Sequence, residues 1–136
     1  TSRYTLISLI EIIKNKTRKA KLIINKKEYS NAFTFIIACN TKHIGKGMYM
    51  APKANVSDGL LDLVIVRGNL SRTRLFKTLP KLFKGTHISD SNVSYHQVSN
   101  FSLITKDCNL LNIDGELKGE TPIDVKVIPS AIEIFN

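Results

Sequence analysis

The spacing of apolar residues predicts two amphipathic helices in this chain. From residue 4 to about residue 19, apolar positions recur at the helical intervals i, i+3, i+4 and i+7, and Ser2 is a suitable N-cap. We expect this helix to cover one end of a sheet or to join two domains, with a helix that lies on a membrane as the alternative. A second helix is predicted over residues 71–84, where one face carries five apolar residues: Leu75, Phe76, Leu79, Leu82 and Phe83. Pro80 should kink or divide it.

Alternating and continuous apolar runs predict strands in the rest of the chain. Residues 21–24 and 31–39 flank a polar segment, which indicates a hairpin with a longer loop. Residues 31–39 and 60–66 are apolar on both faces, as expected for strands inside a sandwich or beneath a helix. Shorter strands are predicted over residues 48–50, 92–105 (one or two strands), 108–113, 123–128 and 131–135. The fold class is mainly β (α+β): an antiparallel β-sandwich with an N-terminal amphipathic helix and one basic mid-chain helix.

The chain is strongly basic, with 20 Lys and Arg against 11 Asp and Glu and a net charge of +9. An excess of this size favours an anionic partner, which can be a nucleic acid, an acidic membrane face or phosphates. The predicted second helix contains five cations and no acid. These cations form either a solvated face or a surface for anionic lipid headgroups. Aromatic residues make up only 7% and no stacking motif is present, so we expect no nucleic acid.

The two cysteines, Cys39 and Cys108, do not have the spacing of a zinc site. Both lie in apolar contexts where a buried thiol is expected. A disulfide between them would require an oxidising compartment, and we expect reduced thiols in the cytoplasm. The sequence contains no apolar run near the roughly 18 to 20 residues that cross a bilayer, so membrane contact is expected to be peripheral, at the inner face.

Two turns carry the candidate chemistry. Asp58 and Gly59 form a turn dipeptide that places a carboxylate at the mouth of a predicted strand. The side chain of Asp58 either bonds its own turn or acts in a site with a second segment. A second turn, Asp114-Gly115-Glu116, lies near the C-terminus.

Together with three other features, these turns resemble the C-terminal domain of the diacylglycerol kinase-like lipid kinases, the family that includes bacterial diacylglycerol kinases and sphingosine kinases. The matching motifs are A-C-N-T (38–41), A-P-K-A (51–54), D-G-L-L-D (58–62), the basic amphipathic helix and D-G-E (114–116). One departure is the loop H-I-G-K-G (43–47), where the family has a denser glycine run. The family also carries an N-terminal nucleotide-binding domain with a G-G-D-G-T signature, which this sequence does not contain. The resemblance therefore identifies residues 1–136 as a C-terminal lipid-binding, catalytic-base domain.

The resemblance implies specific site residues. Glu116 is the implied general base for a lipid hydroxyl. The side chain of Asp58 and main-chain oxygens of Asn55 and Leu60 are the implied ligands of a structural Mg²⁺. Asp62 is a weaker metal candidate.

Other polar residues near these motifs receive simpler interpretations. Asp114 is expected to shape its turn, and His43 to be solvated in its loop. Lys46 and Lys53 could reach phosphates, although loop lysines are usually solvated.

The implied activity is ATP-dependent phosphorylation of the hydroxyl of a lipid such as diacylglycerol. The implied partners are a lipid alcohol, ATP held mainly by the absent domain, and an anionic membrane; a homodimer is left open. Without the nucleotide domain, the chain alone is expected to be inactive. The alternative is a non-catalytic basic β-domain that binds anionic membrane lipids.

Overall fold

The computed structural model describes residues 17–45, 47–68 and 70–133. The predicted N-terminal helix lies outside these residues except at its end, where Arg18 and Lys19 belong to a strand. The described elements are β1 (Arg18–Ile24), β2 (Lys27–Cys39), β3 (Leu61–Arg67), α2 (Arg72–Lys84), the 3₁₀ helix η1 (Thr86–Ser89), β4 (Val93–Val98), β5 (Asn100–Thr105), β6 (Leu110–Ile113), β7 (Glu116–Glu120) and β8 (Ile123–Lys126). The prediction of a mainly β, antiparallel domain is confirmed.

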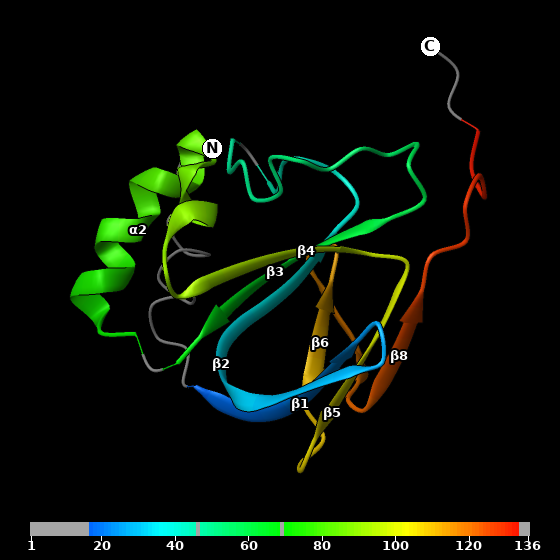
Figure 1. Ribbon diagram of the computed structural model, residues 1–136, viewed down its shortest axis with the longest axis horizontal. Helices are drawn as coiled ribbons and strands as arrows, with labels where there is room; N and C mark the ends of the chain where they lie inside the picture. Colours follow the sequence, from blue (N-terminus) through cyan, green and yellow to red (C-terminus); the bar gives the residue numbers. More distant parts are fainter. Residues whose placement is uncertain (1–16, 46, 69, 134–136) are drawn as a thin grey trace.

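Six strands form one antiparallel sheet in the order β4-β3-β2-β1-β5-β8, and β6 and β7 form a separate two-stranded sheet. The long strand β2 pairs with a different neighbour over each half of its length and bends between the two halves. Its residues 27–33 pair with β1, its residues 33–39 pair with β3, and the register shifts at residues 33–35. Ser99 alone joins β4 to β5, although three strands separate them in the sheet order. The sheet therefore curls until its two ends approach, which gives a sandwich-like domain (Figure 1).

Two apolar clusters lie on opposite faces of this curled sheet. The inner cluster consists of Leu22, Ile24, Phe33, Leu63, Ile65, Val98 and Phe101. The outer cluster consists of Cys39, Met50, Ala51, Ala54 and Val64, with half-buried Leu82 of α2 against it. Successive residues of β3 enter different clusters, so this strand is buried on both faces as predicted. Helix α2 lies beside the outer face (Figure 1).

The β1–β2 hairpin is tighter than the sequence suggested. Asn25 and Lys26 form the whole turn, because both have positive φ angles, 50° and 64°, and Ile24 pairs directly with Lys27. Two successive positive φ angles are typical of a type I′ turn, whose twist matches that of antiparallel strands. The prediction of a longer loop was wrong because the polar residues 27–30 continue β2 at the surface.

Helix α2 begins after Ser71, whose Oγ accepts the Arg74 amide at 3.3 Å, and ends at Gly85. Pro80 was expected to kink or divide this helix, and it does not divide it, since the helix runs through Pro80. Proline removes the bond to the carbonyl four residues earlier, that of Phe76. Phe76 and Pro80 are both exposed, so water can reach this side of the helix.

Several short predictions also need correction. Residues 48–50 form no strand, only a bridge between Ile44 and Met48. Strand β7 was not predicted, because its five residues are exposed and mostly polar. Residues 131–133 are not a strand, and residues 134–136 lie outside the description. Cys39 is buried as expected, but Cys108 is exposed, and both thiols are free.

None of the helices described is long and apolar enough to cross a membrane.

Candidate functional site

The segment that enters β3, residues 55–60, is a compact loop held by its own side chains. The Asn55 side-chain oxygen accepts the Ser57 amide at 3.0 Å, and its main-chain oxygen accepts the Asp58 amide at 3.3 Å. Asp58 Oδ1 accepts the Leu60 amide at 2.9 Å. Asp58 therefore bonds its own turn. We call this segment the 55–60 loop.

The loop leaves oxygen atoms that suit a hard cation. Asp58 is exposed and uses only Oδ1 in its turn, so Oδ2 is available as a ligand. The main-chain oxygens of Asn55 and Leu60 lie in the same six-residue loop. One carboxylate, a few carbonyls and water are a donor set that Mg²⁺ accepts. Across the described residues no three His, Cys, Asp or Glu side chains gather as a metal site, so a cation here would depend on a single carboxylate.

Glu116 is the first residue of β7, directly after a two-residue turn. Asp114 and Gly115 have φ angles of 51° and 92°, and the Gly115 amide donates to the Asn112 side chain at 2.9 Å. Asp114 thus shapes the turn as predicted. The carboxylate of Glu116 is exposed and pairs with the ammonium of Lys118 on the same strand. An exposed carboxylate with one flexible partner is free to meet a ligand.

Glu116 and the 55–60 loop lie on different parts of the fold. The loop leads into β3 of the large sheet, whereas Glu116 belongs to the two-stranded sheet. No hydrogen bond or ion pair within the described ranges links Glu116 to Asp58. The structure therefore brings Asn55, Asp58 and Leu60 together but does not join Glu116 to them.

A buried polar pair behind the loop was not expected from the sequence. Asp62 is completely buried in β3, and the Tyr95 hydroxyl of β4 donates to its Oδ1. The Tyr95 oxygen in turn accepts the Lys53 amide at 3.2 Å. Burial, followed by the hydrogen bond to Asp62, raises the pKa of Tyr95, so the phenol stays protonated. Burial, with a smaller contribution from Asp62, raises the pKa of Cys39 to about 11.

An apolar cavity of about 90 Å³ lies between α2 and the outer face of the sheet. Its walls are mainly aliphatic side chains from β2, β3 and α2, including Ile37, Val64, Val66, Leu75 and Leu79. The sequence predicted the apolar helix face but gave no sign of unfilled space beneath it. Cavities lined by aliphatic groups stay dry and bind apolar molecules.

His87 of η1 forms a polar part of the cavity wall. It is buried, and its Nε2 lies 2.9 Å from the carbonyl oxygen of Met50, whereas Nδ1 has no hydrogen bond to any part of the chain described. Burial lowers the pKa of His87, so the neutral imidazole is favoured.

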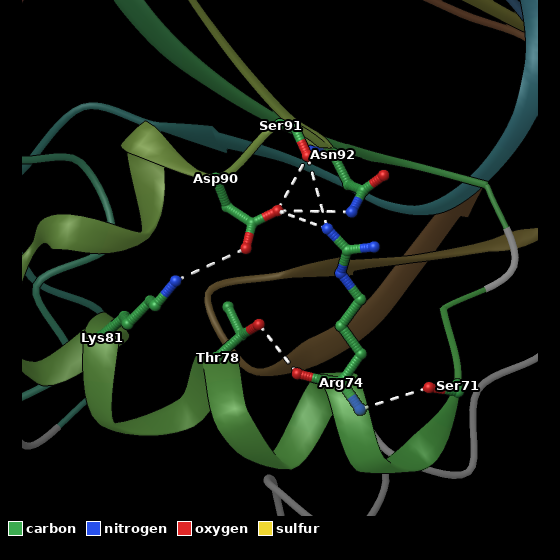
Figure 2. Close-up of polar contacts among 7 residues, drawn as sticks. All are labelled: Ser71, Arg74, Thr78, Lys81, Asp90, Ser91 and Asn92. Carbon is green, nitrogen blue, oxygen red and sulfur yellow. Dashed lines mark hydrogen bonds and ion pairs between the residues drawn. The ribbon is translucent and has the colours of Figure 1, made fainter.

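The outer face of α2 combines cations with exposed apolar residues. Asp90 pairs with Arg74 and Lys81 (Figure 2). Lys77 and Lys84 have no ion pair within the part of the chain described. Phe76 and Phe83, 59% and 45% exposed, lie with exposed Pro80 on the same side of the helix. The prediction that both phenylalanines share the buried face with Leu75 was wrong.

The remaining predicted residues take minor positions. His43 is exposed, and its ring lies 4.9 Å from that of Tyr49. Lys53 is exposed, with its ammonium 5.7 Å from the centre of the Tyr95 ring. Lys46 lies outside the described residues.

Comparison with known proteins agrees with the fold and the motifs. The family described as YegS C-terminal NAD kinase beta sandwich-like domain matches residues 1–136. A diacylglycerol kinase of Mycobacterium tuberculosis is 28% identical over 136 residues, covering 98% of this chain and 43% of the relative. A Staphylococcus aureus protein named "Putative lipid kinase" is 29% identical over 134 residues, covering 94% of this chain and 42% of the relative. The chain thus spans less than half the length of these relatives.

Solved structures show the same fold. The crystal structure of a "putative diacylglycerol kinase" from Bacillus anthracis str. Sterne superposes with a TM-score of 0.75 at 17% identity, covering 93% of this chain and 43% of that one. The resemblance that the motifs indicated is confirmed. The chain belongs to the family of YegS C-terminal NAD kinase β-sandwich-like domains, the C-terminal domain of the diacylglycerol kinase-like lipid kinases.

Proposed function

We propose that this chain is the lipid-binding, catalytic-base part of an ATP-dependent kinase that phosphorylates the hydroxyl of a lipid such as diacylglycerol. It acts together with a nucleotide-binding domain, as expected for a chain that spans 43% of a relative named diacylglycerol kinase. The observation that carries the proposal is the apolar cavity beneath α2, found in a chain of the lipid kinase family.

The cavity has the chemistry to hold part of an acyl chain. Its walls are mainly aliphatic, and its polar members are the neutral His87 with Thr78 and Asp90. At about 90 Å³ it is smaller than the roughly 300 to 1,000 Å³ of typical ligand pockets. A long acyl chain therefore requires α2 to move away from the sheet. Of the four residues with which α2 lines the cavity, Leu75, Thr78, Leu79 and Leu82, only Leu75 is fully buried.

In this proposal Glu116 accepts the proton of the lipid hydroxyl as the phosphoryl group is transferred. Its exposed position at the start of β7 allows it to reach a substrate. General bases of this kind contribute about 10²- to 10⁴-fold to the rate. Asn55, Asp58 and Leu60 would hold Mg²⁺, which lowers the negative charge near the phosphates. Lys53, at the start of this loop, is a candidate for a phosphate contact.

Transfer of radiolabelled phosphate from ATP to a panel of lipid alcohols tests this function. The 136-residue chain is compared with the longest natural open reading frame that contains it. We expect transfer only by the longer protein, and the labelled product names the lipid. Absence of transfer by the longer protein to every lipid alcohol would refute the proposal.

A second function, binding to anionic membranes, is favoured by the outer face of α2. A helix with exposed aromatic residues beside exposed lysines is typical of segments that lie in a membrane surface. Each cation near such a surface contributes about 1 kcal/mol. If the chain is part of a lipid kinase, this face of α2 would hold the domain at the membrane. If the chain has no catalytic role, membrane binding through this face would be its whole function. In this proposal the chain works at the cytoplasmic side of the membrane.

A further inference from the structure

Lys53, an exposed loop residue, contacts β4 at three points. Its amide donates to the Tyr95 hydroxyl at 3.2 Å, and its carbonyl accepts the Gln97 side chain at 3.4 Å. Its ammonium lies 5.7 Å from the centre of the Tyr95 ring, within the range of a cation–π contact. Lys53 precedes the 55–60 loop by a single buried residue, Ala54.

The hydrogen bonds of Tyr95 have only one consistent direction. A phenol has one proton, and an amide can only donate. Because the Lys53 amide donates to the Tyr95 oxygen, the Tyr95 proton is directed to the carboxylate of Asp62. Asp62 is completely buried, so its carboxylate is fixed by packing in β3. The chain of bonds therefore runs from the loop through Tyr95 to the sheet.

Only one of the two carboxylate oxygens of Asp62 takes part in these hydrogen bonds. Its Oδ2 is buried and has no hydrogen-bond partner among the residues that the structure describes. A buried carboxylate with one unpaired oxygen is costly, since each desolvated charge needs hydrogen bonds in compensation. A Leu at this position of an otherwise apolar strand would avoid that cost. The carboxylate thus requires an explanation other than the stability of β3.

We propose that Asp62 and Tyr95 are positioning residues, which fix Lys53 and the adjoining 55–60 loop in the geometry that binds Mg²⁺ and serves phosphoryl transfer. The inference rests on the proposed function. It deepens that function, because it explains how an exposed loop with one carboxylate can form a defined cation site. Asp62 is then not itself a metal ligand. It acts through Tyr95 and the main chain of Lys53.

The variant Tyr95→Phe removes only the hydroxyl and keeps the ring. Tyr29→Phe is the matched control, because Tyr29 packs against the inner cluster on the other face of the sheet. Gln97→Ala removes the hydrogen bond from the Gln97 side chain to the Lys53 carbonyl. Gln97 is exposed, so this variant tests the same idea if Tyr95→Phe fails to fold.

The first readout is amide hydrogen exchange in the 136-residue chain, which does not depend on kinase activity. In Tyr95→Phe we expect exchange of the Lys53 amide and of the 55–60 loop to rise roughly fivefold, as for the loss of one hydrogen bond, with no change in β1 and β5. Gln97→Ala should raise exchange in the same segment. If amide exchange in this segment is no faster in Tyr95→Phe and Gln97→Ala than in Tyr29→Phe, the inference is overturned.

The second readout is Mg²⁺ affinity, measured by titration of the same chain, with Asp58→Ala as the variant that abolishes binding. Tyr95→Phe should lower the Mg²⁺ affinity at least about threefold. This loss is smaller than the roughly 10- to 100-fold loss of affinity seen for residues that contact metal ligands directly. Faster loop exchange with unchanged Mg²⁺ affinity would reduce the pair to a structural role and contradict the inference.

The third readout is turnover of the longer protein. Tyr95→Phe should lower kcat and raise the Mg²⁺ concentration at which turnover is half-maximal, while KM for the lipid stays the same. A rise in lipid KM with unchanged kcat would contradict the positioning role. If the wild-type protein transfers no phosphate, the proposed function fails, whereas the exchange and Mg²⁺ measurements still decide the role of Asp62 and Tyr95.

Discussion

The carboxylate of Asp90 lies 3.5 Å from the guanidinium of Arg74 and 3.6 Å from the ammonium of Lys81, so it joins the corner after α2 to two points of that helix about two turns apart. Its Oδ1 also accepts the Asn92 amide at 3.1 Å. These bonds, first the amide of Asn92 and then the two cations, lower the pKa of Asp90. One residue thus fixes the helix that closes the apolar cavity.

The lowered pKa of Asp90 predicts a pH-dependent contribution to stability. A carboxyl whose pKa is lower in the folded state stabilises the fold above its unfolded pKa of about 3.9, and this contribution is lost as the pH falls through the folded pKa. Asp90→Asn keeps an acceptor for the Asn92 amide. We expect it to lower the free energy of unfolding by up to about 1 kcal/mol at pH 7, with the difference from wild type shrinking as the pH falls below the unfolded pKa and through the folded pKa of Asp90. Urea denaturation over a pH series measures this, and a difference that stays the same over the acidic range would contradict it.

A larger side chain in the cavity should weaken lipid binding without a large loss of stability. Val93 lines the cavity and is half-buried. In Val93→Phe the added ring occupies space that an acyl chain would use, so we expect binding of a fluorescent fatty-acyl probe to fall at least about tenfold. The free energy of unfolding should change by less than about 1.5 kcal/mol, because the ring fills space that is already empty.

The control for this prediction is Val56→Phe, an equal change at an exposed residue away from the cavity. It should leave probe binding unchanged. Undiminished binding in Val93→Phe would show that lipids use another site.

The outer face of α2 predicts binding to anionic vesicles. Replacing Phe76 and Phe83 together by Ser should weaken binding to vesicles that contain phosphatidylserine by at least about tenfold, since each phenylalanine contributes up to about 1.5 to 3 kcal/mol when buried. Binding by the wild-type chain should also fall as salt is raised, because Lys77 and Lys84 act through screened charges. Vesicle co-sedimentation measures both effects.

Leu117→Ser is the control for the vesicle experiment, because Leu117 is an exposed apolar residue of β7, away from α2. Equal losses in Leu117→Ser and in the double variant would mean that exposed apolar residues in general, and not α2, drive binding.

Gly85 should tolerate no side chain, for two separate reasons. Its φ angle is 69°, and an added Cβ would lie 2.4 Å from the Tyr49 ring. Gly68 has a similar φ angle of 76° but open space around it. Gly68→Ala should therefore cost only the backbone strain, about 1 to 3 kcal/mol, whereas Gly85→Ala should cost roughly 1 to 3 kcal/mol more. Thermal unfolding compares the two, and equal losses would exclude the contact with Tyr49.

The sequence was most informative where local chemistry decides the structure. The turn at Asp58-Gly59 and the strand that becomes β3 both depend on residues within a few positions of one another, and each was predicted. The family was recognised from ordered motifs for the same reason, since motifs are local patterns whose order can be read along the chain.

The errors arose where tertiary packing decides. Phe76 and Phe83 satisfy the same helical period as Leu75, and only the position of the sheet determines which stripe is buried. Strand β7 has no apolar alternation, because it pairs with β6 in an exposed two-stranded sheet. The contact between Asp62 and Tyr95 joins residues 33 positions apart, so no sequence spacing could indicate it.

The most direct test of the account compares Glu116→Gln with Glu120→Gln in the longer protein, using transfer of phosphate from ATP to the lipid alcohol. Both residues are exposed and lie at the two ends of β7, Glu116 directly after the turn and Glu120 at the far end of the strand. If Glu116 is the general base, Glu116→Gln lowers turnover at least about 100-fold with unchanged lipid affinity, and Glu120→Gln stays near wild type. Near-normal turnover of Glu116→Gln would contradict the account and return Glu116 to the role of a surface carboxylate.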